Sequence, residues 1–309
     1  MVNTFPGGVW PTMLTPFTKE NEVDYPALEQ MIEWYIDNGV AGLFAVCQSS
    51  EMFHLTLDER VNVARWVKEK VGGRVPVIAS GHVSDSFEKQ VKELNAMAAT
   101  GIDALILITN RLASEDDDDY VLLDNLKKLM DALPSNIPLG FYECPYPYKR
   151  LLSPDVMREC AKTGRFFFHK DTCCDAEQIR EKLAAIKGTN LKFYNANTTT
   201  LLQSLKDGAV GYSGVMANFH PELYVWLCEN PDSPRAQEVS DLLTICSLIE
   251  RQLYPVNAKY AMQLCNLDLG IKCRVKSEED FTESFAEEVG ALMRITHVIK
   301  NQIIKEEVR

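Results

Sequence analysis

The amino-acid sequence predicts an α/β fold, a (β/α)8 barrel of the TIM type with additional C-terminal helices. The first observation behind this prediction is that short, almost wholly apolar runs alternate eight times with longer amphipathic segments. Such runs are typical of parallel strands that are covered by helices on both faces. The second observation is that the alternation continues without a sign of reversed strand order, which favours a closed barrel over an open sheet.

The expected elements can be placed in order along the chain. The strands are expected at residues 9–13, 41–47, 75–80, 104–109, 138–142, 166–170, 191–195 and 210–215. The helices are expected at residues 27–38, 57–71, 85–100, 115 to about 133, 153 onward, 175–186, 199–207 and 221–229. Residues 234–309 are helical in pattern and contain no strand-like run. We therefore divide the chain into a barrel of residues 1–230, with the active site at the C-terminal strand ends, and a helical extension of residues 231–309 packed on it.

Two local signals support these boundaries. Thr56 precedes the expected helix 57–71 as an N-cap, and the pair Gly72-Gly73 ends it. The acidic run of residues 115–119 falls at the expected start of the fourth helix, where it complements the positive end of the helix dipole. The alternative for this run is a divalent-metal site.

Composition and charge narrow the functional classes. The 309 residues are 46 % hydrophobic and 25 % charged, with a net charge of −12, and the pI is about 5.0. Such a surface repels phosphate backbones and anionic lipids, so neither nucleic acid nor a membrane is expected as a partner.

No apolar run approaches the ~18 residues of a spanning helix, and the N-terminus lacks the pattern of a signal peptide. The nine cysteines follow no disulfide or zinc spacing, so we expect reduced, mostly buried thiols and a cytoplasmic protein.

The most informative stretch is the expected sixth strand, an apolar run that ends in Lys170 and continues with Asp171 and Thr172. A lysine at the C-terminal end of such a strand lies where the barrel core opens. Desolvation there disfavours the ammonium form and favours the neutral amine, which can attack a carbonyl. With an ordinary pKa near 10.4, only about 0.04 % of an exposed lysine is free amine at pH 7. The alternative is a surface lysine at a strand end.

Other polar residues are expected at the same mouth, because barrel active sites lie at the C-terminal strand ends. In chain order they are Gln48, Ser49, Ser50, Glu51, Tyr142, Glu143, Lys170, Thr172, Asn195, Asn197 and Ser213. A lysine, a tyrosine and several hydroxyls at one mouth are typical of Schiff-base chemistry. The lysine would supply the amine, and the tyrosine would move protons to and from the carbinolamine. The turn of Gln48, Ser49 and Ser50 can hold a carboxylate.

Other chemistries fit less well. The five histidines are scattered without metal-ligand spacing, so no metal is expected. No glycine-rich loop has dinucleotide or Walker spacing, so no cofactor is expected. His169 alternates with Lys170 and is expected to face the helical layer, and Cys173 and Cys174 are expected to pack rather than to act in redox chemistry.

Six segments in order resemble the dihydrodipicolinate synthase / N-acetylneuraminate lyase family of class I, pyruvate-dependent aldolases. They are distributed over nearly the whole length of the chain, at residues 8–17, 42–51, 141–145, 169–172, 208–218 and 255–262. Residues 141–145 match the family's Tyr-Asn-x-Pro motif, and residues 169–172 match its Lys-(Asp/Glu)-(Ser/Thr) motif. The resemblance implies that Lys170 forms an imine with pyruvate or another 2-oxo acid and that Tyr142 shuttles protons. It also implies that Ser49 binds the carboxylate, that Gln48 takes the neighbouring hydroxyl position, and that Thr172 and Ser213 line the pocket. The family uses no metal or organic cofactor and is commonly tetrameric.

The chain also departs from the family pattern. Gln48 replaces a Ser/Thr, and Ser50 replaces a loop glycine. Where the synthase has an aromatic pair, this chain has residues 109–112. Where the synthase has an arginine that binds a second carboxylate, this chain has Pro147. Both differences argue against a role in lysine biosynthesis. The Gly-x-Asp-Glu stretch of the sialic-acid branch corresponds to residues 196–199, which argues against that substrate. Glu143 in place of asparagine is expected to put a carboxylate beside Tyr142 that disfavours an anionic acceptor, or tunes the tyrosine.

We therefore expect a cofactor-free lyase, either an aldolase or a dehydratase, that acts on a 2-oxo acid or sugar acid through Lys170. One alternative is a non-catalytic binder of 2-oxo acids or sugar acids from the same family. A further alternative is an unrelated barrel enzyme in which the order of motifs arose by chance.

Overall fold

Eight parallel strands form one sheet in the computed structural model, which describes residues 5–307 and side chains as far as residue 303. The strands are β1 Gly8–Val9, β2 Leu43–Val46, β3 Val77–Ala79, β4 Ala104–Ile108, β5 Leu139–Tyr142, β6 Phe166–Asp171, β7 Lys192–Asn195 and β8 Gly211–Tyr212. Their order in the sheet is β1-β8-β7-β6-β5-β4-β3-β2. The ring closes between the segment after β1 and β2, where the amide of Met13 donates to the carbonyl of Phe44 at 3.0 Å. The expected (β/α)8 barrel is confirmed.

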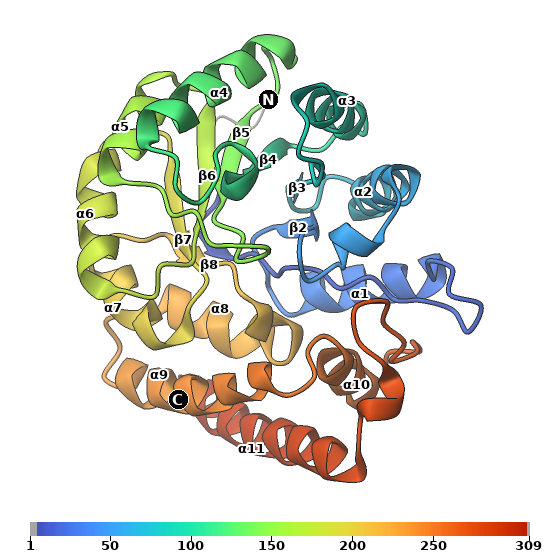
Figure 1. The fold of residues 1–309 in the computed structure, drawn as a ribbon. Coiled ribbons are helices and arrows are strands. Elements are labelled where there is room, and N and C mark those ends of the chain that lie inside the picture. The colour runs from blue at the N-terminus through green and yellow to red at the C-terminus, as the bar shows by residue number, and fades with distance from the viewer. Residues whose placement is uncertain (1–4, 308–309) are drawn as a thin grey trace.

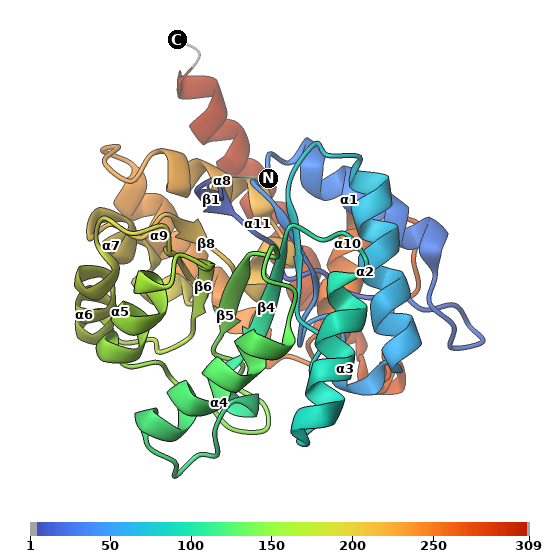
Figure 2. The same ribbon diagram turned by 90° about the horizontal axis from the view of Figure 1, so that it is seen from above.

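Eight helices surround the strands, as Figure 1 shows from one end and Figure 2 from above. They are α1 Tyr25–Asp37, α2 Leu57–Val71, α3 Phe87–Ala98, α4 Asp119–Ala132, α5 Pro154–Lys162, α6 Ala176–Ile186, α7 Leu201–Lys206 and α8 Pro221–Glu229. Short 3₁₀ helices are η1 Met52–His54, η2 Thr109–Arg111, η3 Thr198–Thr200, η4 Val215–Asn218, η5 Ser247–Arg251 and η6 Glu278–Asp280. Most follow strands at the barrel mouth, where they turn the chain toward the next helix.

Three further helices follow the barrel, as the sequence predicts. They are α9 Ala236–Cys246, α10 Val256–Leu264 and α11 Glu283–Glu307, drawn in orange to red in Figure 1 beside α8 and α1. The ends of the expected barrel and extension, residues 1–4 and 308–309, lie outside the described residues. In the described part of the chain, no helix is both long enough and apolar enough to cross a membrane.

The local signals and the observed boundaries agree best at α2. Its N-cap Thr56 and Glu59 form a capping box, and Gly72 ends the helix in the left-handed conformation. The acidic run lies at the start of the fourth helix, as expected, with Asp118 as the N-cap of α4 and Asp119 in its first turn, whereas residues 115–117 precede the helix. The expected last strand is also shorter, since the chain turns into η4 soon after Tyr212.

Aromatic side chains fill the barrel interior below the mouth. Trp10, Phe44, Phe168 and Tyr194 form this aromatic floor, and the Phe168 and Tyr194 rings stack with centroids 4.2 Å apart. Phe168 stands two residues before Lys170, and side chains two apart on a strand point to the same side. The floor therefore supports Lys170 from below.

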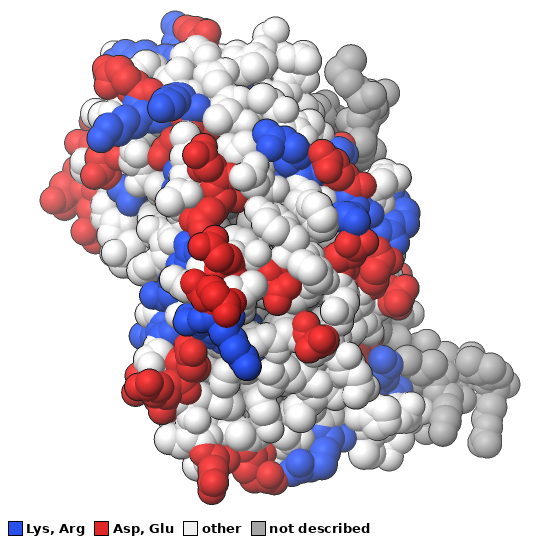
Figure 3. Space-filling view, turned by 90° about the vertical axis from the view of Figure 1, so that its right-hand side faces the viewer, with Lys and Arg blue, Asp and Glu red and all other residues white. Residues whose placement is uncertain are grey.

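On the face drawn in Figure 3, acidic and basic side chains alternate rather than forming a continuous basic surface, in keeping with the net charge of −12.

All nine cysteines are free, and Cys174 is exposed. Five of the nine are buried and three are partly buried, so the expectation of mostly buried thiols is confirmed, whereas the expectation that Cys174 packs is wrong.

Candidate active site

Lys170 lies at the mouth end of β6 with its side chain inside the barrel. The residue is only 3 % exposed. Its ammonium nitrogen lies 4.2 Å from the centroid of the Tyr142 ring and 5.8 Å from that of Phe44. No carboxylate among the described residues forms an ion pair with it. The alternative of a surface lysine is therefore wrong.

The sheet register brings Lys170 and Tyr142 together. β5 and β6 are neighbours, and the two residues are paired directly across the ladder. Burial raises the pKa of Tyr142 well above its ordinary value, helped by the nearby thiols of Cys144 and Cys47. Tyr142 thus keeps its proton at neutral pH and can donate it.

Burial also decides the state of Lys170. Removal from water lowers the pKa of Lys170 to about 8, although the nearby Cys47, Cys144 and Glu250 act in the opposite direction. A lower pKa means a larger share of neutral amine at physiological pH, which is the form that attacks a carbonyl.

The turn after β2 presents its residues to the mouth in different ways. The Gln48 side-chain oxygen accepts from the Tyr142 hydroxyl at 3.4 Å and from the Cys144 thiol at 3.3 Å. The Ser49 hydroxyl donates to that of Thr12 at 3.1 Å. Gln48 is thus in contact with Tyr142, and Ser49 lies beside the strand that closes the barrel.

Ser50 is used inside its own turn, contrary to the expectation that it binds substrate. Its hydroxyl donates to the Cys47 carbonyl at 2.7 Å and accepts from the Cys47 amide at 2.8 Å. The side chain thereby stabilises the turn and leaves no hydroxyl proton for a ligand.

The two remaining hydroxyls differ as well. Thr172 donates its hydroxyl proton to the backbone carbonyl of Glu143 at 2.7 Å, so it links β6 to β5 rather than lining a pocket with a free group. The Ser213 hydroxyl, after β8, is buried and has no hydrogen-bond partner among the described residues. Of these two, Ser213 is the one whose hydroxyl is available to a ligand.

Glu143 does not lie where the sequence suggested. Its side chain is fully buried, and the carboxylate accepts from the Leu152 and Thr172 amides at 2.8 and 3.0 Å and from Lys182 at 2.7 Å. Neighbouring residues on a strand point to opposite faces, so the residue after the inward Tyr142 points outward. The prediction that this carboxylate binds substrate is wrong.

Glu143, His169, Asp171 and Lys182 form a buried group that we name the β5–β6 charge cluster. Glu143, His169 and Asp171 offer three potential metal-ligand atoms within 4.8 Å of one another. The Lys182 ammonium lies between the two carboxylates, however, 2.7 Å from Glu143 and 2.5 Å from Asp171. It already supplies the positive charge that a cation would bring. His169 faces the helical layer here, as expected.

Two further charged residues near the site were not singled out in the sequence. Glu250, in η5 of the C-terminal extension, is close enough to Lys170 for each charge to shift the pKa of the other. Burial raises the pKa of Glu250 to about 7. No sequence pattern indicates that Glu250 lies near the site. Lys182 could have been recognised as buried, because it lies on the apolar side of α6 with Ile179 and Ile186.

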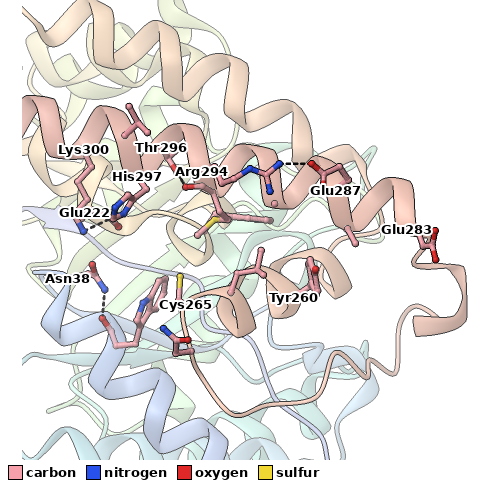
Figure 4. Close-up of a pocket in the computed structure, with 18 residues that line it drawn as sticks. Asn38, Glu222, Tyr260, Cys265, Glu283, Glu287, Arg294, Thr296, His297 and Lys300 are labelled. Carbon is pink, nitrogen blue, oxygen red and sulfur yellow. Dashed lines mark hydrogen bonds and ion pairs between the residues drawn. The ribbon is translucent and has the colours of Figure 1, made fainter.

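A separate groove of about 930 Å³ lies between α11 and the helices α1, α8 and α10 (Figure 4). Its lining contains two ion pairs, Lys300–Glu222 and Arg294–Glu287. None of the site residues predicted from the sequence lines this groove.

The chain has clear relatives among known proteins. It is 26 % identical over 266 residues to the 4-hydroxy-tetrahydrodipicolinate synthase of Clostridium tetani, covering 84 % of this chain and 87 % of that protein. It is 27 % identical over 265 residues to the synthase of Clostridium perfringens strain SM101, covering 84 % and 88 %.

Solved structures share the fold. The YagE protein of E. coli K12, a prophage protein of the dihydrodipicolinic acid synthase family in complex with pyruvate, aligns with a TM-score of 0.83 at 21 % identity, covering 95 % of this chain and 98 % of that one. The dihydrodipicolinate synthase of Acinetobacter baumannii, complexed with pyruvate, aligns with a TM-score of 0.83 at 22 % identity, covering 94 % and 98 %. The sequence profile of the dihydrodipicolinate synthetase family matches residues 5–292, so the chain belongs to that family.

Proposed function

We propose that this protein is a class I lyase, an aldolase or dehydratase, that forms an imine between Lys170 and a 2-oxo acid. The observation that carries the proposal is the buried Lys170 amine, which has no ion-pair partner among the described residues and lies 4.2 Å from the centroid of the Tyr142 ring. The pyruvate bound to two family members of the same fold supports the substrate class.

The chemistry follows from these two side chains. The neutral Lys170 amine attacks the carbonyl carbon of the 2-oxo acid, and the carbonyl oxygen takes up a proton to give a carbinolamine. Tyr142 donates a proton to the departing hydroxyl, which leaves as water, and a protonated imine remains. In the aldolase direction of cleavage, the substrate hydroxyl two carbons from the imine carbon loses its proton and becomes the carbonyl of a released aldehyde. The electrons of the breaking C–C bond pass to the imine and form an enamine. Protonation of the enamine carbon and hydrolysis of the imine then release pyruvate and regenerate the amine.

A dehydratase would start from the same imine. The imine acidifies the carbon next to it, loss of a proton from that carbon gives an enamine, and the enamine expels hydroxide, which leaves as water once protonated. The residues named here serve either outcome equally well.

The substrate carboxylate is assigned to Ser49 and its backbone amide. Gln48 would hold Tyr142 through their 3.4 Å hydrogen bond, and the free Ser213 hydroxyl would contact the bound acid. We also propose a homotetramer, as is common in the family, with sedimentation of the purified protein as the test.

The experiment is intact-mass analysis after incubation with pyruvate and borohydride. Wild type should gain one reduced pyruvate, and Lys170→Ala should gain none. Lys162→Ala, which removes an exposed lysine on α5, serves as the matched control and should be labelled like wild type. Absence of an adduct from folded wild type with a panel of 2-oxo acids would reject the lyase and favour the non-catalytic binder.

A further inference from the structure

The β5–β6 charge cluster lies directly behind the two residues to which we assign the chemistry. Tyr142 and Lys170 are paired across β5 and β6 and face the barrel interior. Glu143 follows the first and Asp171 follows the second, so both carboxylates point to the outer face of the sheet. Each carboxylate is therefore one peptide unit away from a reacting side chain.

The cluster fixes the backbone where the strand ladder ends. Glu143 accepts from the Thr172 amide at 3.0 Å and from the Leu152 amide at 2.8 Å. Asp171 accepts from the Cys173 amide at 3.0 Å. The bonds of Glu143 continue the connection between β5 and β6 beyond the last ladder pair and hold the loop that follows β5, and the bond of Asp171 holds the turn that follows β6.

Lys182 of α6 is the part of the cluster that joins the two carboxylates. Its ammonium bonds both of them, and all three side chains are at most 2 % exposed. Burial by itself would lower the pKa of Lys182, but Glu143 and Asp171 outweigh it and raise that pKa above its ordinary value. Burial would likewise raise the pKa of Asp171, but His169 and Lys182 hold it well below the usual range. The lysine and Asp171 thus stay charged at neutral pH.

A buried ion cluster adds little net stability compared with apolar side chains of the same volume, because desolvation offsets the attraction. What it does provide is a fixed geometry, since each carboxylate accepts directional hydrogen bonds. We propose that Lys182 is a positioning residue of the active site, which holds Lys170 and Tyr142 in their mutual orientation through Asp171 and Glu143. This proposal rests on the imine chemistry proposed above.

The test compares imine trapping by wild type, Lys182→Met and Lys182→Arg under single-turnover conditions with pyruvate. Misplacement of reacting groups by about 1 Å can cost 10²-fold in rate. We expect Lys182→Met to lower the trapping rate at saturating pyruvate by roughly tenfold or more, with the half-saturating pyruvate concentration nearly unchanged. Lys182→Arg, which keeps the charge, should recover most of the rate.

A matched control separates positioning from general destabilisation. Arg60→Met breaks another buried ion pair, Arg60–Glu93 at 2.9 Å, which joins α2 to α3 rather than β5 to β6. Like Lys182→Met, it should lower the melting temperature, but it should not slow trapping at a temperature where both variants are folded. If Lys182→Met does not fold, Glu143→Gln replaces it, because it keeps the shape of the side chain and removes the charge.

Each outcome is informative. Trapping by Lys182→Met or Glu143→Gln at the wild-type rate would overturn the positioning role while leaving the lyase proposal intact. A rate loss of equal size in Arg60→Met would also overturn it. Absence of trapping in wild type would instead reject the imine mechanism, and the positioning role with it.

Discussion

Lys170 differs from an ordinary strand-end lysine through its surroundings. The side chain is enclosed by the rings of Tyr142 and Phe44 and by two thiols, and no described carboxylate pairs with it. An unpaired ammonium is costly in such a place, so the proton is held less tightly. This environment, more than the residue type, makes the side chain a candidate nucleophile.

The pH dependence of imine trapping should report this environment. Because the pKa of Lys170 is about 8, its neutral fraction increases with pH and is nearly complete from about one unit above that pKa. We expect the trapping rate with pyruvate and cyanoborohydride, after correction for the reductant alone, to rise about tenfold from pH 7 and to level off near pH 9. A rate that continues to rise to the ordinary lysine pKa near 10.4 would contradict the buried amine.

Glu250 should tune that profile. Its negative charge favours the ammonium form of Lys170 and thus raises the pKa of the lysine. Glu250→Gln removes the charge, so the midpoint of the trapping profile should move to lower pH. Glu229→Gln, at the exposed end of α8, is the control and should leave the midpoint unchanged. An unchanged midpoint in Glu250→Gln would show that its carboxylate does not act on Lys170.

At the scale of single elements, strand alternation organises the site. On β6, Lys170 faces the mouth while Asp171 faces α6, and the same alternation separates Tyr142 from Glu143 at the end of β5. One residue step thus divides the reacting side chains from the side chains that hold them. The ends of a helix depend on residues close by in the chain. The N-cap of α2 can therefore be tested with a single substitution.

Removing the N-cap of α2 should lower the free energy of unfolding of the protein. Thr56 accepts from the Glu59 amide at 3.2 Å, and Glu59 accepts from the Thr56 amide at 2.8 Å. Thr56→Ala loses the first bond, so we expect a decrease of about 1 kcal/mol in the free energy of unfolding, measured with urea. Thr56→Ser keeps a hydroxyl and should lose much less. Equal stability of Thr56→Ala and wild type would show that the cap does not contribute.

At the scale of the whole molecule, the C-terminal extension is tied to the barrel by a buried ion pair. Lys259 of α10 lies 3.0 Å from Glu51, and both side chains are fully buried. Glu51 directly follows the turn of Gln48, Ser49 and Ser50 and has a left-handed backbone, with φ of 62°. The extension thereby supports the turn to which we assign carboxylate binding.

Breaking this pair should destabilise the protein strongly. Lys259→Met leaves the Glu51 carboxylate buried without its cation, for which we expect a loss of about 3–5 kcal/mol in the free energy of unfolding. Lys259→Met/Glu51→Gln removes both charges and should recover part of the loss. Urea unfolding of the two variants measures this difference. A double variant less stable than the single one would show that the carboxylate is not the source of the cost.

The sequence alone determined the barrel, the order of its elements and the chemistry-bearing residues at the strand ends. Apolar periodicity and capping signals are local, and they define α2 together with its cap at Thr56. The rule that strand ends meet at one mouth is general to the fold, which is why Lys170 and Tyr142 could be expected side by side before any coordinates.

Only the tertiary structure decided what each side chain contacts. The outward carboxylate of Glu143, the bridging ammonium of Lys182 and the approach of Glu250 to Lys170 depend on contacts between residues far apart in the chain. The hydroxyl of Thr172 donates to the carbonyl of Glu143, and that of Ser50 donates to the carbonyl of Cys47 within its own turn. A motif fixes which groups reach the mouth, but hydrogen bonding and burial in three dimensions determine which of them remain free to act.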